Sequence, residues 1–437
     1  MKFHKKTTLA LLLAGALVPV YATASASALE NRAAQTFSSA EKGGQSRVSW
    51  GLWLQQQIEQ HPDIIAAKAA VNARLSMADG KDKRLYNPEL ATEFEQEGAN
   101  DNFALGINQT IDWWDKRSVR MKQGDYDRLA VGQEYKQLLQ EKTAEVLHSL
   151  VKWQSVNSLA ELARSQEEQL NTLLNLVEQR QLSGDLSQVD AELAYLSLSQ
   201  KLNTTAQAQA QLQQVEADLG QLLPGWSAAS GQIPERLWSL GDVNNPVNLD
   251  NHPGIVAAKA RWQALKQQAV IARLETRADP TFGLSAGKSG GDDVVALSFS
   301  MPLNINNDFS DEARAANQEA ASVEALYRSV IRKQQFSLQA SQAVFLEYQK
   351  KYQRWLDVMQ GRAERTSRLL AAQWQSGDIS TSEYLLALQQ RSEGLQAGIE
   401  LRTAYQGAKI DWLLQTGEID LVIKQLPAVS PLLIPYK

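Results

Sequence analysis

Two long stretches of the chain show the hydrophobic spacing of packed helices. Apolar residues recur there at intervals of three, four and seven positions, with Gln, Glu, Lys and Arg between them, which is the pattern of a helix with one packed and one hydrated face. Proline, which breaks helices, is absent from residues 89–223 and 303–426. The pattern predicts very long helices whose packed faces carry Tyr135, Leu138, Leu139, Val146, Leu150, Trp153, Val344, Phe345, Tyr348, Tyr352, Trp355 and Val358.

The same short polar turn occurs once in each stretch. Residues 183–195 read SGDLSQVDAELAY, and residues 376–388 read SGDISTSEYLLAL. A helix from Asp115 to Leu182 spans about 100 Å at 1.5 Å per residue, so we expect it to reverse at the turn and return as an antiparallel partner toward Gly220. The repeated turn therefore predicts two helical hairpins, residues 115–220 with a tip near 184 and residues 308–416 with a tip near 377.

The residues of each turn suit the end of one helix and the start of the next. Gly184 and its counterpart Gly377 tolerate the left-handed conformation that ends many helices. Ser187 and Ser380 are good N-cap residues. Asp190 and Glu383 stand three positions later, where a capping box places its acidic side chain.

Two segments with a period of two precede the long helices. Residues 103–114 read FALGINQTIDWW and residues 294–303 read VVALSFSMPL, and each alternates apolar with polar or small residues. This alternation is typical of a strand with one apolar face. Shorter alternating segments, residues 89–95 and 281–287, come before them across polar, glycine-rich connections. The pattern predicts two strand hairpins, residues 89–112 and 281–303.

The chain is one unit written twice. HPDIIAAKA at residues 61–69 returns as HPGIVAAKA at residues 252–260, and the strand hairpins and turns follow in the same order at nearly the same offset. The predicted domains are a first repeat, a linker, a second repeat and a C-terminal tail, at residues 29–220, 221–248, 249–416 and 417–437.

The N-terminus and the composition indicate export. Lysines followed by a short apolar run and by small residues predict a secretory signal peptide over residues 1–28. The chain has no cysteine, so disulfides, thiolate metal sites and the cysteine-linked lipid of a bacterial lipoprotein are excluded. A net charge of −5 argues against nucleic-acid partners, which are bound through clustered Lys and Arg.

In an exported chain the paired hairpins favour a membrane interpretation. Strands of about ten residues with one apolar face are what an outer-membrane barrel needs, although a half-buried hairpin of a soluble protein shows the same alternation. Trp113 and Trp114 stand at a strand end, where aromatic girdles lie. Four strands cannot close a barrel, and open edges do not survive in lipid. We therefore expect an oligomer: a dimer for eight strands or a trimer for twelve.

Matches to enzyme motifs do not have the context that the chemistry needs. GLSAG at residues 283–287 lies inside a predicted strand, and the last histidine, His252, comes before it rather than after it. GKS at residues 287–289 has no glycine at the position that a phosphate-binding loop requires. His61 and His252 each precede a proline at a helix break, which favours a role in turn structure. We expect no enzyme activity, no cofactor and no resident metal.

The ordered landmarks resemble those of the TolC-like outer-membrane efflux proteins. YNPELATEFEQEG at residues 86–98 and LGINQTIDWWDKRSVR at residues 105–120 are similar to segments of the heavy-metal branch, the cobalt–zinc–cadmium type. SFSMPLNIN at residues 298–306 resembles the family's second strand. Trp113, Trp114 and Asp115 stand where that branch commonly has a glycine-rich turn.

This resemblance implies a mostly helical fold with a membrane β-barrel. Duplicated helical hairpins would form a trimeric tunnel, and each protomer would give four strands to a twelve-stranded barrel in the outer membrane of a Gram-negative bacterium. The tunnel would extend into the periplasm and meet a periplasmic adaptor protein, which holds an inner-membrane pump. Outer-membrane lipid would surround the barrel. The adaptor-docking tips would be Gly184, Asp185, Leu186, Ser187, Gly377, Asp378, Ile379 and Ser380.

The resemblance also places carboxylates at the periplasmic aperture. Glu383 matches the first of two acidic positions that follow the second tip in the family, whereas Leu386 occupies the second. Asp190 and Glu192 stand at the equivalent place after the first tip. The alternative is that these carboxylates only start their helices, where the helix dipole favours negative charge.

Three functions remain open at this point. The sequence favours the exit duct of a tripartite efflux system, with heavy-metal cations as the exported class. Ducts for drugs or for type I protein secretion share the same architecture. A periplasmic coiled-coil scaffold without a channel belongs to a different class, in which the strand hairpins would pair with a partner.

Overall fold

The computed structural model describes the chain from residue 49 to residue 426 with short gaps. Within this part of the chain no helix is both long enough and apolar enough to cross a bilayer. The predicted signal peptide, residues 1–28, and the end of the predicted tail lie outside the described residues. The described ranges are 49–97, 100–184, 186–228, 232–241, 246–359 and 362–426.

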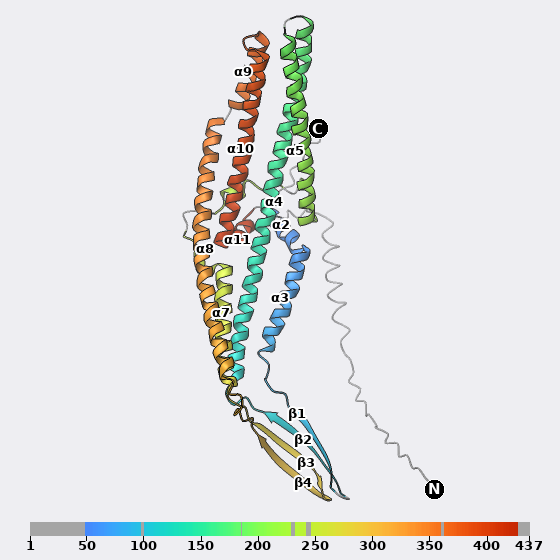
Figure 1. Ribbon diagram of the computed structural model, residues 1–437, viewed down its shortest axis with the longest axis vertical. Helices are drawn as coiled ribbons and strands as arrows, with labels where there is room; N and C mark the ends of the chain where they lie inside the picture. Colours follow the sequence, from blue (N-terminus) through green and yellow to red (C-terminus); the bar gives the residue numbers. More distant parts are fainter. Residues whose placement is uncertain are drawn as a thin grey trace, which may run out of the picture. The chain divides into compact units, whose positions relative to one another are not determined.

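Long helices make up most of the described chain, which confirms the mostly helical prediction. The first hairpin consists of α4 (Lys116–Leu182) and α5 (Gln188–Leu222). The second consists of α8 (Ser310–Met359), α9 (Arg362–Ser376) and α10 (Thr381–Thr416). In Figure 1 the four strands lie at one end of α4, and the turn that follows α4 lies at its other end.

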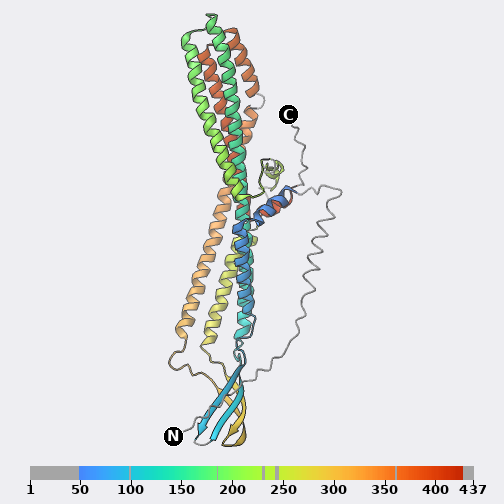
Figure 2. The same cartoon turned by 90° about the vertical axis from the view of Figure 1, so that its right-hand side faces the viewer.

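The second hairpin is described as three helices. The sequence predicts a helical hairpin over residues 308–416 with a tip near 377. Before the tip, α8 ends at Met359 and α9 begins at Arg362 (Figure 2), and residues 360–361 lie outside the described residues.

Shorter helices begin at the two histidine–proline pairs. His61 and His252 are the N-caps of α3 (Pro62–Gly80) and α7 (Pro253–Glu275), and the Nδ1 of each accepts a backbone N–H two residues on at 3.2 Å. Burial lowers the pKa of His252, which favours the neutral ring that can accept this bond. The role in turn structure is confirmed. The remaining helices are α2 (Trp50–Glu59), α6 (Arg236–Ser239), η1 (Leu249–Asn251) and α11 (Ile419–Lys424).

The four strands form a single antiparallel sheet in the order β1-β2-β3-β4. Its strands are β1 (Glu89–Glu97), β2 (Asn100–Thr110), β3 (Thr281–Ser289) and β4 (Asp292–Ser300). The β2–β3 ladder joins the two repeats, so β1 and β4 each have one partner and stand at the edges. The predicted last strand is displaced: it ends at Ser300, since Pro302 has no N–H for a ladder bond.

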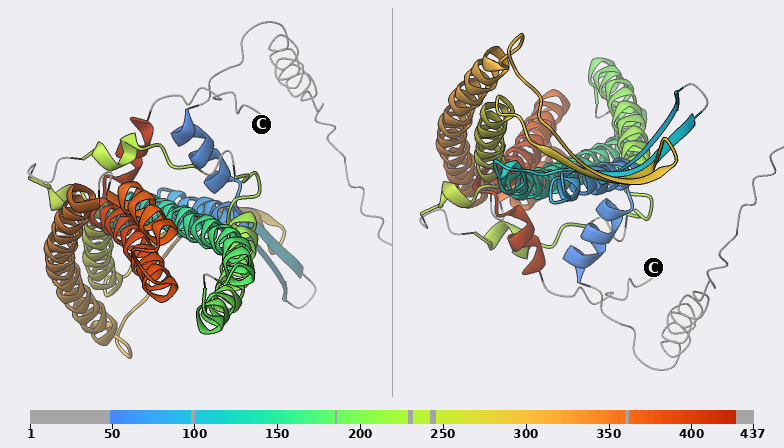
Figure 3. Two further views of the ribbon diagram at one scale, coloured as in Figure 1. Left: turned by 90° about the horizontal axis from the view of Figure 1, so that it is seen from above. Right: turned by 90° about the horizontal axis from the view of Figure 1, so that it is seen from below.

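The sheet has one apolar and one polar or small face, as the alternation predicts. On the apolar face Leu297 is 85% and Phe94 73% exposed. Across the other face Glu93, Ala104 and Gly287 are in register. Seen from below in Figure 3, the sheet is curved.

The main hydrophobic cluster lies midway along α4, around the end of α5 and the short helices α2, α6 and α11. Among its fully buried members is Phe345 of α8, whose ring stacks on those of Tyr405 and Trp412. The ammonium group of Lys409 is buried against Phe345 and Trp412, with ring centroids at 4.7 and 4.6 Å, and donates to the carbonyl of Gly241 at 3.2 Å. This cluster ties the linker segment to both helical hairpins.

Candidate functional site

The first hairpin tip turns through a left-handed glycine. Gly184 has φ +82°, and its N–H donates to the carbonyl of Gln181 at 3.1 Å. Asp185 lies outside the described residues. Ser187 then caps α5, because its Oγ accepts the N–H of Asp190 at 3.1 Å.

The second tip has the same left-handed glycine, and two backbone hydrogen bonds close its turn. Gly377 has φ +80°, and its N–H donates to the carbonyl of Trp374. The N–H of Asp378 donates to the carbonyl of Gln373, so α9 ends in a Schellman motif. The Oδ2 of Asp378 also accepts the hydroxyl of Ser376 at 2.6 Å.

Two of the three carboxylates predicted at the aperture, Asp190 and Glu383, cap their own helices. Glu383 completes a capping box: its Oε2 accepts the backbone N–H of Ser380 at 2.8 Å, while the Oγ of Ser380 accepts the N–H of Glu383. Asp190 accepts the hydroxyl of Ser187 at 2.7 Å, which is the looser version that the sequence predicts. Glu192 is exposed one turn from that cap.

Removing the carboxylate of Glu383 is expected to loosen the first turn of α10. The hydrogen bond from the backbone of Ser380 lowers the pKa of Glu383, so the ionised form favours the folded state. This contribution is present above the ordinary pKa of glutamate and is lost as the pH falls through the lowered value. The protection factor of the Ser380 amide, which is its exchange rate relative to an unfolded peptide at the same pH, should therefore be lower in Glu383→Ala than in the native protein, and lower at pH 3 than at pH 7.

Glu383→Gln separates capping from a role at the aperture. Its amide carbonyl still accepts the Ser380 N–H, but the negative charge is gone. Unchanged exchange together with reduced cation selectivity in a planar bilayer would assign charge a role beyond the cap. Glu400→Gln is the control, since it removes the same charge from an exposed side chain of α10 that lies far from the tip.

The two tips of one chain are held together by a contact that the sequence does not reveal. The Arg180 guanidinium stacks on the Trp374 ring at 4.6 Å and donates to the backbone carbonyls of Trp374 and Gln375 at 3.1 and 2.6 Å. Trp374 is buried and donates its indole N–H to Thr381 at 3.2 Å. Leu186 and Ile379, one from each tip, both pack against the apolar cluster around Trp374.

At the other end of the helices, each long helix starts from a left-handed residue that is not glycine. Asp115 before α4 has φ +55°, and Phe309 before α8 has φ +57°. Asp112 satisfies the first turn of α4, because its two carboxylate oxygens accept the N–H groups of Lys116 and Arg117 at 2.8 Å each. The strand-to-helix corner is thus repeated in both halves.

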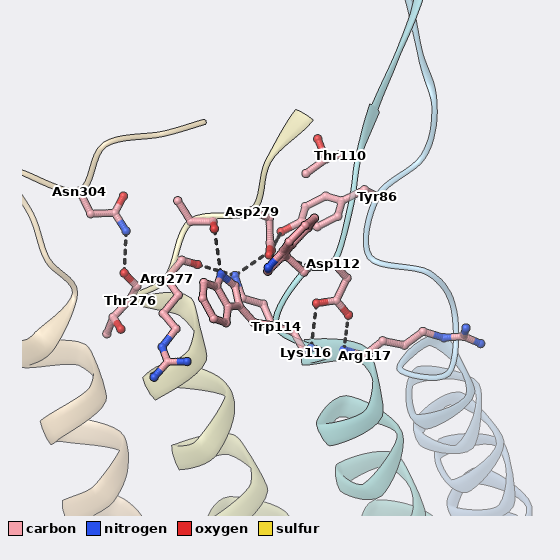
Figure 4. Close-up of polar contacts among 12 residues, drawn as sticks. Tyr86, Thr110, Asp112, Trp114, Lys116, Arg117, Thr276, Arg277, Asp279 and Asn304 are labelled. Carbon is pink, nitrogen blue, oxygen red and sulfur yellow. Dashed lines mark hydrogen bonds and ion pairs between the residues drawn. The ribbon is translucent and has the colours of Figure 1, made fainter. Parts of the chain in front are cut away.

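A buried ion pair joins the two repeats at this corner. Lys116 Nζ lies 2.8 Å from Asp279 Oδ2, and the two side chains are only 6% and 2% exposed (Figure 4). Nζ also donates to the carbonyl of Arg277 at 2.9 Å. The hydroxyl of Tyr86 donates to the same Asp279 oxygen at 2.7 Å. Burial is the main cause that raises the pKa of Tyr86 above its ordinary value, and the hydrogen bond to Asp279 is the second cause.

The two tryptophans predicted at the membrane interface lie at the same corner. They follow the end of β2 at Thr110 rather than belonging to the strand. Trp113 is 62% exposed, and its backbone N–H donates to Asp279 at 3.2 Å. Trp114 donates its indole N–H to the carbonyl of Ala278 at 3.0 Å and stacks under Arg277 at 4.7 Å.

Sequence reasoning missed Lys116 and Asp279, although one signal was present. Asp279 precedes Pro280 in the segment that answers Asn87-Pro88 of the first repeat, and Lys116 begins the first long helix. A polar residue at equivalent corners of both repeats is the observation that could have drawn attention to them. Within the described residues no group of three or more His, Asp or Glu side chains could hold a metal ion.

One family model matches part of the chain. Residues 53–225 match the family model of outer membrane efflux proteins. Proteins of that family are passive channels rather than enzymes, in agreement with the sequence prediction. Comparison with curated proteins gives no match.

The fold is that of solved outer-membrane channels. CusC is 16% identical with a TM-score of 0.69, over 84% of this chain and 92% of CusC. VceC from Vibrio cholerae is 17% identical with a TM-score of 0.68, over 84% of this chain and 98% of VceC. CmeC from Campylobacter jejuni is 11% identical with a TM-score of 0.68, over 84% and 85%.

The two comparisons agree with each other. The described chain has the fold of solved outer-membrane channels, and residues 53–225 match the model of the outer membrane efflux proteins.

Proposed function

We propose that the protein is the outer-membrane exit duct of a tripartite efflux system that exports heavy-metal cations. It works as a homotrimer, with three four-stranded sheets closing a twelve-stranded barrel in the outer membrane of a Gram-negative bacterium. The helical hairpins extend into the periplasm, where an adaptor protein docks and connects them to an inner-membrane pump.

One observation carries this proposal: a sheet with an exposed apolar face and two unpaired edges stands at the opposite end of α4 from the paired tips. Such a sheet is unfavourable in water because of its apolar face and in lipid because of its open edges. Pairing β4 of one protomer with β1 of the next removes the open edges, so the apolar face can then lie in lipid. Three protomers place six tips around one opening.

Heavy-metal cations are the proposed cargo because of the similarity of the segments around residues 86–98 and 105–120 to the heavy-metal branch. The described residues offer no metal-binding cluster, and a passive duct needs none. A deletion strain should become sensitive to cobalt, zinc or cadmium and recover when the gene is restored. Sensitivity to organic drugs with unchanged metal tolerance would support the alternative drug duct.

The channel itself is tested by fractionation and by conductance. We expect the protein in the outer-membrane fraction as a trimer, and we expect the purified trimer to form channels in planar bilayers. Recovery of a monomer that washes off membranes with high salt would favour the periplasmic coiled-coil scaffold instead.

Valine at the two tip glycines is expected to impair efflux while the trimer still assembles. Gly184 and Gly377 have positive φ, and no other part of the chain lies within 4 Å of a Cβ built there, so valine strains the turn without a steric clash. Metal tolerance and adaptor cross-linking should both fall in the double Val variant. The double Asn variant is the control, because asparagine tolerates left-handed backbone. Full metal tolerance of the double Val variant would contradict a role of the tips in adaptor docking.

A further inference from the structure

A small basic pocket lies where the first strand pair meets the helices. Its volume is about 300 Å³, and its walls come from the segment before β1, the end of β2 and the first turn of α4. Arg84 and Arg117 line it together with the apolar side chains of Leu85 and Ile111. Tyr86, Thr110, Asp112 and Arg117 of this wall are visible in Figure 4.

The charge of the pocket favours an anion. Arg84 and Arg117 are both exposed. Arg117 donates from Nε to the carbonyl of Asp82 at 3.1 Å, which orients its guanidinium group. Asp112 is the acidic residue in the wall, and both of its carboxylate oxygens already accept the N–H groups at the start of α4. The lining of the pocket therefore has two arginines and one carboxylate, and the carboxylate is committed to the helix.

The pocket is continuous with the apolar face of the sheet. Gln109 and Ile111 in its wall extend the odd-numbered row of β2, in which Phe103, Leu105 and Ile107 are exposed. A ligand held at the arginines can thus lie with an apolar chain along this row. The exposed Trp113 follows directly, as aromatic residues do at a membrane surface.

The far end of the same face has a different character. There Lys288 lies 3.8 Å from Asp293, and Asp101 adds a second carboxylate to the same face. Among the described residues, the end next to the helices combines two arginines, a pocket and an adjoining apolar row.

We propose that this pocket binds the phosphate of an anionic phospholipid in the leaflet that faces the periplasm, with the acyl chains lying along the β2 row. Guanidinium groups match phosphate oxygens in geometry and charge. The inference rests on the outer-membrane location given under the proposed function. The bound phosphate would fix the depth of the barrel, with Arg84 and Arg117 at the level of the lipid headgroups.

Native mass spectrometry of the detergent-purified protein, titrated with phosphatidylglycerol or phosphatidylcholine, tests the proposal. We expect tighter binding of phosphatidylglycerol. The double variant Arg84→Gln with Arg117→Gln should lose about thirtyfold of that affinity, at about fivefold per basic residue, and should bind phosphatidylcholine as before. The matched control, Lys288→Gln with Arg328→Gln, removes two exposed charges elsewhere and should change nothing.

One further variant and a competition with inorganic phosphate complete the test. Arg84→Glu keeps the bond between Arg117 and Asp82 and should still lower the affinity for phosphatidylglycerol, so a folding defect of the double variant does not obscure the result. Equal affinity of the native protein and both pocket variants for phosphatidylglycerol overturns the proposal. Displacement of the lipid by inorganic phosphate at equal concentration also overturns it, because the pocket would then be a site for a free anion.

Conductance in a purely zwitterionic bilayer separates this inference from the function on which it rests. Channels formed by the native protein, together with equal affinity for phosphatidylglycerol and phosphatidylcholine, would refute the lipid pocket alone. Failure of the native protein to form channels in any bilayer would refute the proposed duct.

Discussion

Substitution of Lys116 by methionine is expected to lower the free energy of unfolding by about 3–5 kcal/mol, because it leaves the Asp279 carboxylate buried without its cation. The loss should exceed that of any exposed ion pair of the chain, since such pairs contribute little. Denaturant unfolding in detergent at one fixed protein concentration, followed by far-UV circular dichroism, measures the difference.

The double variant Lys116→Met with Asp279→Asn tests the explanation. A neutral amide needs no cation and still accepts the Tyr86 hydroxyl. The double variant should therefore recover a large part of the stability that the single variant loses. If it is as unstable as Lys116→Met alone, the cost comes from lost packing of the lysine chain rather than from a buried charge.

The second large effect is expected at Trp374. Its replacement by alanine should cost about 3–5 kcal/mol in the stability of the tip region, because a buried indole ring is deleted from the cluster that holds both tips. Its stacking with Arg180 and Tyr384 and its bond to Thr381 are lost as well. Hydrogen exchange along α9 and the end of α4 should become faster, while exchange around the buried Leu150 of the main cluster stays as it was.

Trp374→Phe and Arg180→Ala divide this effect into its parts. Phenylalanine keeps an aromatic ring for stacking but gives up the indole N–H bond to Thr381, so a smaller loss is expected. Alanine at position 180 removes the two bonds to the backbone of the second tip and leaves Trp374 in place. An equally fast exchange at α4 and α9 in the native protein and in Trp374→Ala would show that the ring does not hold the tips together.

The sequence was most informative where a local pattern directly reflects a local constraint. Absence of proline and a spacing of three and four residues indicated α4 and α5 nearly to their ends, since both reflect backbone bonding within a few residues. Alternation identified the apolar face of the sheet, because side chains of a strand point to opposite faces in turn. Ser380 and Glu383 were recognised as a capping box because that motif joins residues only three positions apart.

The contacts that the sequence did not reveal join residues far apart in the chain. Lys116 meets Asp279 and Arg180 meets Trp374 across the two repeats, and neither pair lies in a shared local motif. The end of the last strand was missed for another reason. Alternation of apolar residues runs past Ser300 to Leu303, but ladder bonding does not continue through a proline.

Because the sheet has open edges, we expect the stability of the proposed duct to depend on protein concentration. Strands β1 and β4 are nine residues each, and each leaves one row of backbone groups without a strand partner among the described residues. If β4 of one protomer pairs with β1 of the next, that free energy is gained only on association, so the midpoint of unfolding rises with protein concentration. The strands would then be the last part of the chain to become ordered, and their ordering would coincide with assembly and membrane insertion.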